Sequence, residues 1–263
     1  MRDEALESME QYSSVWKAIV AELPGADIRE DAGLSIRWAD SPFPFWNAVF
    51  LAEPSMDAVR LKDHLRQSAS YVRQKAQSGL IYLCEEYLND SAKAALPAAL
   101  KEAGLELSLP VHGMAGDILP LVPSAHPALQ MRRVTEEAQL MLYADINCEG
   151  YGFPMDWGRV GLRGMRLWTD RAFSYMGYVQ DRAVCCASVV MHDGNLYLAL
   201  VATRPEAQRK GYGEAVVRHA LQSAYDSTGV RRTILHASDA GFPVYRRVGY
   251  HKTASILAYK LLS

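Results

Sequence analysis

The sequence lacks any long uninterrupted hydrophobic run. Apolar residues make up 49% of its 263 residues, but polar side chains interrupt each apolar stretch before it reaches the roughly 20 residues that a transmembrane helix needs. The first residues, MRDEALESMEQ, are charged where a secretory signal would carry its apolar segment. We therefore expect no membrane span, no membrane partner and a cytoplasmic protein.

Cysteine is scarce, and its spacing indicates no pairs. The four cysteines are Cys84, Cys148, Cys185 and Cys186, and none forms a C-x-x-C motif. The adjacent Cys185 and Cys186 would point to opposite faces of a strand. The seven histidines show neither H-x-x-x-H nor H-E-x-x-H spacing. These absences predict buried free thiols in a reducing compartment and no bound metal.

An excess of charge of one sign is also absent. The chain has 28 Lys and Arg against 30 Asp and Glu, for a formal net charge of −2. Such a balance provides no bulk attraction to nucleic acid, so we expect no nucleic-acid partner. The proportions of apolar and charged residues are those of a globular chain, long enough for one large domain or two ordinary ones. Nothing in the composition indicates the oligomeric state.

One stretch, residues 198–217 (LALVATRPEAQRKGYGEAVV), combines a strand, a basic loop and a helix. Residues 197–202 form an apolar run that predicts a buried strand. From Gly213 onward, Ala and Val recur at helical spacing. A loop with glycines before a helix suits a phosphate, because the first amides of a helix lack partners and carry partial positive charge. An ordinary surface loop before a helix is the alternative interpretation.

The glycines of this loop distinguish between known phosphate motifs. The Walker pattern G-x-x-x-x-G-K-[ST] is missing, and Val216 occupies the third glycine position of a dinucleotide fingerprint. Gln208, Gly211 and Gly213 instead match [QR]-x-x-G-x-[GA]. This pattern resembles the acetyl-CoA loop of the GNAT N-acetyltransferase superfamily, although Gln208 stands where many members have arginine.

A second motif lies downstream in the order that this family has. Tyr245 stands four residues before the pair Gly249-Tyr250, and GNAT members commonly have a tyrosine at that distance from a Gly-[Phe/Tyr] pair. Two ordered motifs about thirty residues apart are far more specific than either alone. The resemblance rests on motifs from about Leu129 to the end of the chain.

The order of expected elements extends the resemblance to the first half. The second half is expected to run as strand 196–202, helix 214–225, strand 231–237, short helix 243–248 and closing strands from 250. The first half repeats that order as strand 46–52, helix 57–77, strand 80–83, helix 94–103 and strands 105–109 and 113–119. We predict an α/β fold of two GNAT-like domains, each a mixed, mostly antiparallel central sheet flanked by helices. Two unrelated α/β segments are the alternative.

The first of these halves is expected to be degenerate. Between its strand and helix it has only Glu53-Pro54-Ser55-Met56, without glycine and with a carboxylate that would repel phosphate. Leu100 stands where the tyrosine would fall. We predict a degenerate N-terminal domain at 1–122, a proline-rich linker at 123–128 and the catalytic domain at 129–263.

The resemblance implies roles for individual residues. In the family, the strand before the loop diverges from its neighbour, its backbone holds the pantetheine arm of acetyl-CoA, and an amide near Val201 would polarise the thioester. Ser238, just past the next strand, either contacts the coenzyme or caps a turn. The implied coenzyme contacts are Leu200, Val201, Thr203, Gln208, Arg209, Lys210, Gly211, Tyr212, Gly213 and Ser238.

Tyr245 is the expected general acid of such a transferase. A phenol is protonated at neutral pH and can give its proton to the departing thiolate; a merely packed aromatic is the alternative. Residues 149–157 are expected to form a loop at the acceptor site. Glu149 and Asp156 there are candidates for the base, and Tyr151, Phe153 and Trp157 for an acceptor pocket. A water chain could also serve as base. Solvated surface carboxylates are the alternative interpretation of the two acids, and half-buried packing is that of the aromatics.

These features predict an acyltransferase of the GNAT type, which moves an acetyl group from acetyl-CoA to a primary amine of a small molecule or peptide. Two alternatives stay open: a non-catalytic acyl-CoA-binding or regulatory module, and a transferase for a different acyl group. The acceptor amine and the base are not identified by any residue pattern.

Overall fold

A computed structural model describes residues 2–120 and 129–262. The chain divides into two compact units. The first comprises Met1–Met114, His236–Phe242 and Lys252–Ser263, and the second comprises Ala115–Leu235 and Pro243–His251. The units therefore do not follow the order of the chain, because two late segments belong to the first. The predicted linker, residues 123–128, lies outside the described residues, and the domain limits 1–122 and 129–263 stay predictions.

The first unit begins with a long helix and continues as a small α/β layer. Its helices are α1 (Arg2–Val20), α2 (Ala58–Arg73) and α3 (Asp90–Ala103). Its strands are β1 (Asp27–Asp31), β2 (Leu34–Trp38), β3 (Asn47–Leu51), β4 (Leu80–Cys84) and most of β5 (Leu105–Asp117) and β11 (His251–Leu261). The strand order is β1-β2-β3-β4-β11-β5, with β3 and β4 parallel and β4 and β11 antiparallel.

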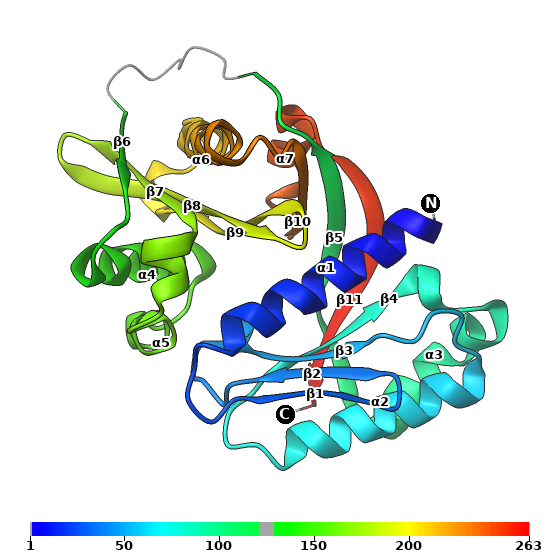
Figure 1. Ribbon diagram of the computed structural model, residues 1–263. Helices are drawn as coiled ribbons and strands as arrows, with labels where there is room; N and C mark the ends of the chain where they lie inside the picture. Colours follow the sequence, from blue (N-terminus) through cyan, green and yellow to red (C-terminus); the bar gives the residue numbers. More distant parts are fainter. Residues whose placement is uncertain (1, 121–128, 263) are drawn as a thin grey trace. The chain divides into compact units, whose positions relative to one another are not determined.

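Aromatic packing closes the core of this unit. Tyr12 of α1 lies edge-on to Trp16, Phe50 and Tyr82 with ring centroids 4.6, 5.0 and 5.0 Å away. Helix α1 covers one side of these strands, and α2 and α3 cover the other (Figure 1). Caps delimit the two shorter helices: the Asp57 carboxylate accepts two amides at the start of α2, and Gly104 ends α3 at a φ of +67°.

The second unit contains the stretch singled out in the sequence. Its helices are α4 (Glu137–Tyr151), α5 (Met155–Leu162), α6 (Tyr212–Thr228) and most of α7 (Phe242–Val248). Its strands are β6 (Gln130–Arg133), β7 (Phe173–Val179), β8 (Arg182–His192), β9 (Asn195–Thr203) and most of β10 (Arg232–Ala237), with the end of β5. The order is β5-β10-β9-β8-β7-β6.

This sheet is mixed, with its parallel pair at the loop of interest. Strands β6 to β9 pair antiparallel in succession, whereas β9 and β10 pair parallel. Helices α4 and α5 lie on one side of β7 to β9 and α6 lies on the other (Figure 1). The predicted α/β class with mixed, mostly antiparallel sheets flanked by helices is confirmed in both units.

Several predicted elements need correction. The two strands expected at 105–109 and 113–119 are one strand, β5, and the closing strands merge into the single β11. Strand β1 was not predicted, because its sequence DIRED has no apolar alternation. The loop expected at 149–157 is mostly helical: α4 runs to Tyr151 and α5 begins at Met155.

Burial of the cysteines agrees with the prediction. All four are buried free thiols, and burial raises the pKa of Cys84, Cys185 and Cys186 above its usual range. No helix in the described part of the chain has both the length and the apolarity to cross a bilayer.

Candidate active site

The site is built around an irregularity in β9. The pairing between β8 and β9 shifts register between Cys186 and Ser188, which puts Leu200 and Val201 opposite one residue of β8. Leu200 has a φ of +49°, a left-handed conformation that is rare for a residue with a large side chain. These features define a β-bulge, which bends a strand and redirects its backbone groups.

The other edge of β9 loses its neighbour at the same place. The parallel ladder with β10 ends at the pair Leu198 and Leu235, while β9 continues to Thr203. The backbone of residues 199–203 therefore runs on past its last paired position on that edge. The divergence expected from the family resemblance is present in this strand.

Two tyrosines of α4 bind the carbonyl groups of the bulge. The Tyr143 hydroxyl donates to the carbonyl of Leu200 at 2.7 Å, and the Tyr151 hydroxyl donates to that of Val201 at 2.9 Å. Tyr143 is fully buried, and burial raises the pKa of its phenol well above the usual value. Tyr151 is 39% exposed as a residue, and burial of its phenol and the nearby Tyr245 raise its pKa. Both phenols thus stay protonated and can donate.

The loop after β9 leads into α6 through a left-handed glycine. Gly211 is the N-cap of α6 at a φ of +79°, and its carbonyl accepts the amide of Ala215. Gly213 follows in the first turn, where a Cβ would lie 3.0 Å from the Thr203 hydroxyl. The first amides of α6 carry the partial positive charge that an anion prefers. Tyr212 opens the helix, and its carbonyl accepts from the Cys185 thiol at 3.4 Å.

The side chains before Gly211 differ in how they are held. The Gln208 amide donates to the Thr203 carbonyl at 3.2 Å, and the Lys210 ammonium donates to the Glu206 carbonyl at 3.0 Å. Arg209 is exposed and has a φ of +60°. This loop therefore presents two cationic side chains beside the start of α6.

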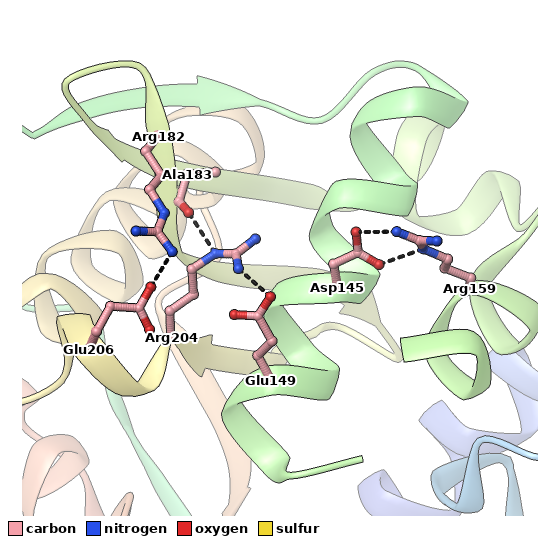
Figure 2. Close-up of polar contacts among 7 residues, drawn as sticks. All are labelled: Asp145, Glu149, Arg159, Arg182, Ala183, Arg204 and Glu206. Carbon is pink, nitrogen blue, oxygen red and sulfur yellow. Dashed lines mark hydrogen bonds and ion pairs between the residues drawn. The ribbon is translucent and has the colours of Figure 1, made fainter. Parts of the chain in front are cut away.

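Ion pairs brace the same loop (Figure 2). Arg204 donates to the Ala183 carbonyl at 2.9 Å and also contacts the Glu149 carboxylate of α4. Arg182 pairs with Glu206 in the 3₁₀ turn before Gln208. Arg204 is only 11% exposed at its side chain. Its contacts connect β8, α4 and the beginning of the loop.

Tyr245 lies on α7 in the second unit. It is 9% exposed, and its ring packs edge-on to Tyr250 with centroids 6.1 Å apart. Burial, with the nearby Cys186 thiol as a second cause, raises the pKa of its phenol above the usual value. Within the described part of the chain, no side chain forms a hydrogen bond with the Tyr245 hydroxyl. The group is protonated and available as a donor, as the predicted general acid requires.

Ser238 belongs to the first unit, apart from the other predicted coenzyme contacts. Its carbonyl accepts the amides of Gly241 and Phe242 at 3.0 Å each, and its hydroxyl lies 3.4 Å from the Gly241 amide. The serine closes the turn before α7. Its contact with a coenzyme stays a prediction.

The predicted acceptor residues fall into two groups. Glu149 is bound to Arg204, whereas Asp156 is exposed in the first turn of α5. Phe153 lies between Tyr151 and Trp157, with ring centroids 6.1 Å from each, and these three aromatics form one surface at the junction of α4 and α5. Arg159 of α5 binds Asp145 of α4 through two contacts of 2.7 and 2.9 Å (Figure 2).

Tyr143, Ser188 and Arg204 are the important residues that sequence reasoning did not single out. Tyr143 falls within the apolar run of a helix and Ser188 within a buried strand, so both are typical of core positions. Arg204 follows the strand directly, and its position before Pro205 was the local signal that it belongs to the loop.

Comparison with known proteins agrees with this geometry. Residues 140–250 match the acetyltransferase (GNAT) family, a range that contains the bulge, the glycine loop and Tyr245. No curated protein matches the sequence. The predicted resemblance to the GNAT superfamily is thereby confirmed.

Solved structures show that the fold extends over the whole chain. A GCN5-related N-acetyltransferase from Kribbella flavida is 17% identical with a TM-score of 0.70, covering 97% of this chain and 96% of its own. A functionally unknown conserved protein from Staphylococcus epidermidis is 16% identical with a TM-score of 0.65, at 90% and 94% coverage. A tandem GNAT protein from the clavulanic acid biosynthesis pathway is 10% identical with a TM-score of 0.59, at 98% and 94% coverage. The chain thus has a tandem GNAT fold, and that fold supports acyl transfer in general.

Proposed function

We propose that the second unit is an acetyl-CoA-dependent N-acetyltransferase, which moves an acetyl group to a primary amine. The observation that carries this proposal is the sequence of backbone features along one strand and loop. The bulge at Leu200, the end of the β9–β10 ladder and the left-handed Gly211 before α6 follow one another within fourteen residues. Together they supply an unpaired strand edge for an extended arm and a helix start for a phosphate.

The residues present fit the coenzyme's two ends. The first amides of α6, with Gln208, Arg209 and Lys210 beside them, would receive the pyrophosphate, and Gly211 and Gly213 keep side chains away from it. The backbone of Leu200, Val201 and Thr203 would hold the pantetheine arm. Tyr212 would add its helix amide. Acetyl-CoA supplies an activated acyl group as a thioester.

The proposed reaction is a direct transfer without a covalent enzyme intermediate. The neutral amine attacks the thioester carbon, so a C–N bond forms and the C–S bond breaks. The Val201 amide donates to the carbonyl oxygen, where negative charge develops. Tyr245 gives its phenolic proton to the departing sulfur, and a base takes the proton that the amine loses.

The base and the acceptor are the open parts of the proposal. Glu149 is engaged by Arg204, which leaves the exposed Asp156 or a water as the better candidates. The aromatic surface of Tyr151, Phe153 and Trp157 would border the acceptor, a small-molecule or peptide amine. A cytoplasmic location, where acetyl-CoA is available, belongs to the same proposal.

The test is a thiol-release assay on the full chain with acetyl-CoA and a panel of primary amines. Amine-dependent release of free coenzyme A supports the proposal. Release with a longer acyl-CoA but not with acetyl-CoA would indicate a transferase for a different acyl group. Tight acetyl-CoA binding without release for any amine would indicate a binding or regulatory module.

A further inference from the structure

The peptide between Leu200 and Val201 is held from one side by buried donors. Its carbonyl accepts from the Tyr143 hydroxyl at 2.7 Å, and the Cys186 thiol lies 3.7 Å away in donor geometry. A carbonyl that is reached by a side chain from α4 points out of the hydrogen-bonded ladder, toward the helix packed on the sheet. The positive φ of Leu200 makes this direction possible.

A chain of hydroxyls holds Tyr143 in turn. The Ser188 hydroxyl donates to the Tyr143 oxygen at 2.8 Å and lies 2.8 Å from the hydroxyl of Ser174. Tyr143, Ser174 and Ser188 are all fully buried. Because the Tyr143 oxygen accepts from Ser188, its single proton is directed to the Leu200 carbonyl. The chain thus extends from β7 through β8 and α4 to the bulge of β9.

The orientation of one amide follows from this arrangement. No peptide bond in the described chain is cis, and in a trans peptide the C=O and N–H point in opposite directions. The Leu200 carbonyl points to Tyr143, so the Val201 N–H points away from it. The Tyr151 hydroxyl binds the next carbonyl, that of Val201. The peptide groups before and after Val201 are therefore both held by tyrosines of α4.

We propose that Tyr143 is a positioning residue of the transfer reaction, whose hydroxyl aims the Val201 amide at the thioester carbonyl. This inference rests on the proposed function. Tyr143 itself touches neither substrate: it acts through the Leu200–Val201 peptide. Burial keeps its phenol protonated, which the donation to Leu200 requires.

The decisive variant is Tyr143→Phe, which keeps the ring and removes the hydroxyl. Tyr175→Phe is the matched control, because the Tyr175 hydroxyl also makes one side-chain bond in this unit, 2.7 Å from Ser223 of α6, on the side of the sheet opposite to α4. We expect kcat to fall by about tenfold to a hundredfold in Tyr143→Phe, less than the ~10²–10³ lost when an oxyanion donor is deleted. The KM for acetyl-CoA should stay within about twofold, and Tyr175→Phe should keep both parameters.

A spectroscopic readout separates aiming from mere packing. The probe is a ketone analogue of acetyl-CoA in which a methylene replaces the thioester sulfur, compared with S-ethyl coenzyme A, which has no carbonyl. Binding to the wild type should lower the infrared carbonyl frequency of the ketone, because the amide polarises it. Tyr143→Phe should lose most of that shift and bind S-ethyl coenzyme A unchanged. Ser188→Ala, which leaves Tyr143 in place, should lose part of the shift.

The outcomes distinguish the inference from the function on which it rests. A full carbonyl shift and a wild-type kcat in both Tyr143→Phe and Ser188→Ala would overturn the positioning role alone. A wild-type chain that binds neither analogue would overturn the proposed function and the inference with it. If Tyr143→Phe melts too early to be assayed, Ser188→Ala decides: an undiminished shift refutes the role, and a reduced one supports it.

Discussion

At the scale of single residues, the site depends on groups held in unusual states. Leu200 adopts a left-handed backbone conformation, which costs about 1–3 kcal/mol for a residue with a side chain. The hydrogen bonds from Tyr143 and Tyr151 each stabilise the folded state by about 0.5–1.5 kcal/mol. These magnitudes are similar, so the two tyrosines of α4 offset much of the backbone strain at Leu200.

Tyr245 is the residue whose hydroxyl is proposed to protonate the departing sulfur. Tyr245→Phe keeps the packing against Tyr250 and removes only that proton donor. General acid catalysis is worth about 10²–10⁴-fold, so kcat should fall within that range while acetyl-CoA affinity barely changes. Because the pKa of Tyr245 is raised by burial, wild-type activity should show no loss from its ionisation up to about pH 9. Steady-state kinetics across pH measure both effects.

Tyr250→Phe is the control for this variant, since it removes a neighbouring hydroxyl to which no step is assigned. It should keep kcat. A near-normal kcat together with a lowered melting temperature in Tyr245→Phe would mean that the tyrosine only packs, and that the proton comes from elsewhere.

His236 is a half-buried histidine of the first unit, and we expect it to make the stability of the protein depend on pH. Its ring stacks on Tyr12 at a centroid distance of 3.8 Å, and its Nε2 lies 3.0 Å from the Ser8 hydroxyl. Burial lowers the pKa of His236 to about 3. The unfolded chain, with a histidine pKa near 6.5, binds this proton more readily, so stability is present above that value and falls as pH drops from about 6.5 toward 3.

The expected loss is about 2 kcal/mol between pH 8 and pH 5, since one pKa unit corresponds to about 1.4 kcal/mol. Urea unfolding at the two pH values measures it. His236→Gln removes the titration and keeps a polar group for Ser8, so its stability should depend on pH by about 2 kcal/mol less, even if the variant is weaker overall. Equal pH dependence in both proteins would contradict the assignment.

At the scale of elements, the same strand–loop–helix unit has two different helix starts. In the second unit α6 begins after Gly211 with no side-chain cap. In the first unit α2 begins after Asp57, whose carboxylate accepts the amides of Val59 and Arg60 at 3.0 and 2.8 Å. A carboxylate thus occupies in α2 the position where the proposed function places the pyrophosphate in α6.

Helix α6 offers a matched pair of variants for testing whether its start binds phosphate, because both of its caps are left-handed glycines. Gly211 precedes it at a φ of +79° and Gly229 ends it at +72°. Gly211→Ala and Gly229→Ala impose similar backbone strain of about 1 kcal/mol. Only Gly211→Ala places a side chain in the proposed phosphate loop. If that side chain costs the pyrophosphate one or two charge-assisted hydrogen bonds to backbone amides, coenzyme A binding should weaken about tenfold to a hundredfold.

Isothermal titration and thermal melting on both variants separate binding from folding. Similar melting temperatures with a selective affinity loss in Gly211→Ala are expected. Unchanged affinity there would mean that the loop is only the start of a helix.

At the scale of the whole molecule, the two units share an element order but differ in the residues of the loop before the helix. The loop of the first unit contains Glu53, whose carboxylate binds the buried His64 at 2.7 Å, and it leads to the capped start of α2. A carboxylate at each of these positions would repel a second phosphate. Element order is therefore shared between the units, while the anion site is expected in only one.

One coenzyme should bind per chain, at the second unit. Titration calorimetry should give a stoichiometry near one, and hydrogen exchange should show new protection at residues 208–213 without any at residues 46–57. Two equivalents per chain, or protection of the first loop, would contradict this prediction.

Much of the fold and part of the site could be predicted from the sequence. Gln208, Gly211 and Gly213 could be proposed as a phosphate loop from the sequence, because the requirements of such a loop lie in neighbouring residues. Tyr245 could be proposed as the general acid from its distance to Gly249, and that role stays a prediction. Strands and helices of both units were predicted where apolar periodicity was strong, and strand β1 was missed because its side chains are polar.

Only the tertiary structure decided how the bulge is held and where the chain divides. Tyr143 and Leu200 are 57 residues apart in the sequence, and a buried tyrosine in a helix has the same local pattern whether it packs or donates a hydrogen bond. The sequence likewise gives no sign that two late segments, His236–Phe242 and Lys252–Ser263, belong to the first unit. Local sequence determines turns, caps and periodicity, because these depend on near neighbours. The direction of a carbonyl in a bulged strand depends on donors from other elements, so it is determined only when the strands and α4 have packed.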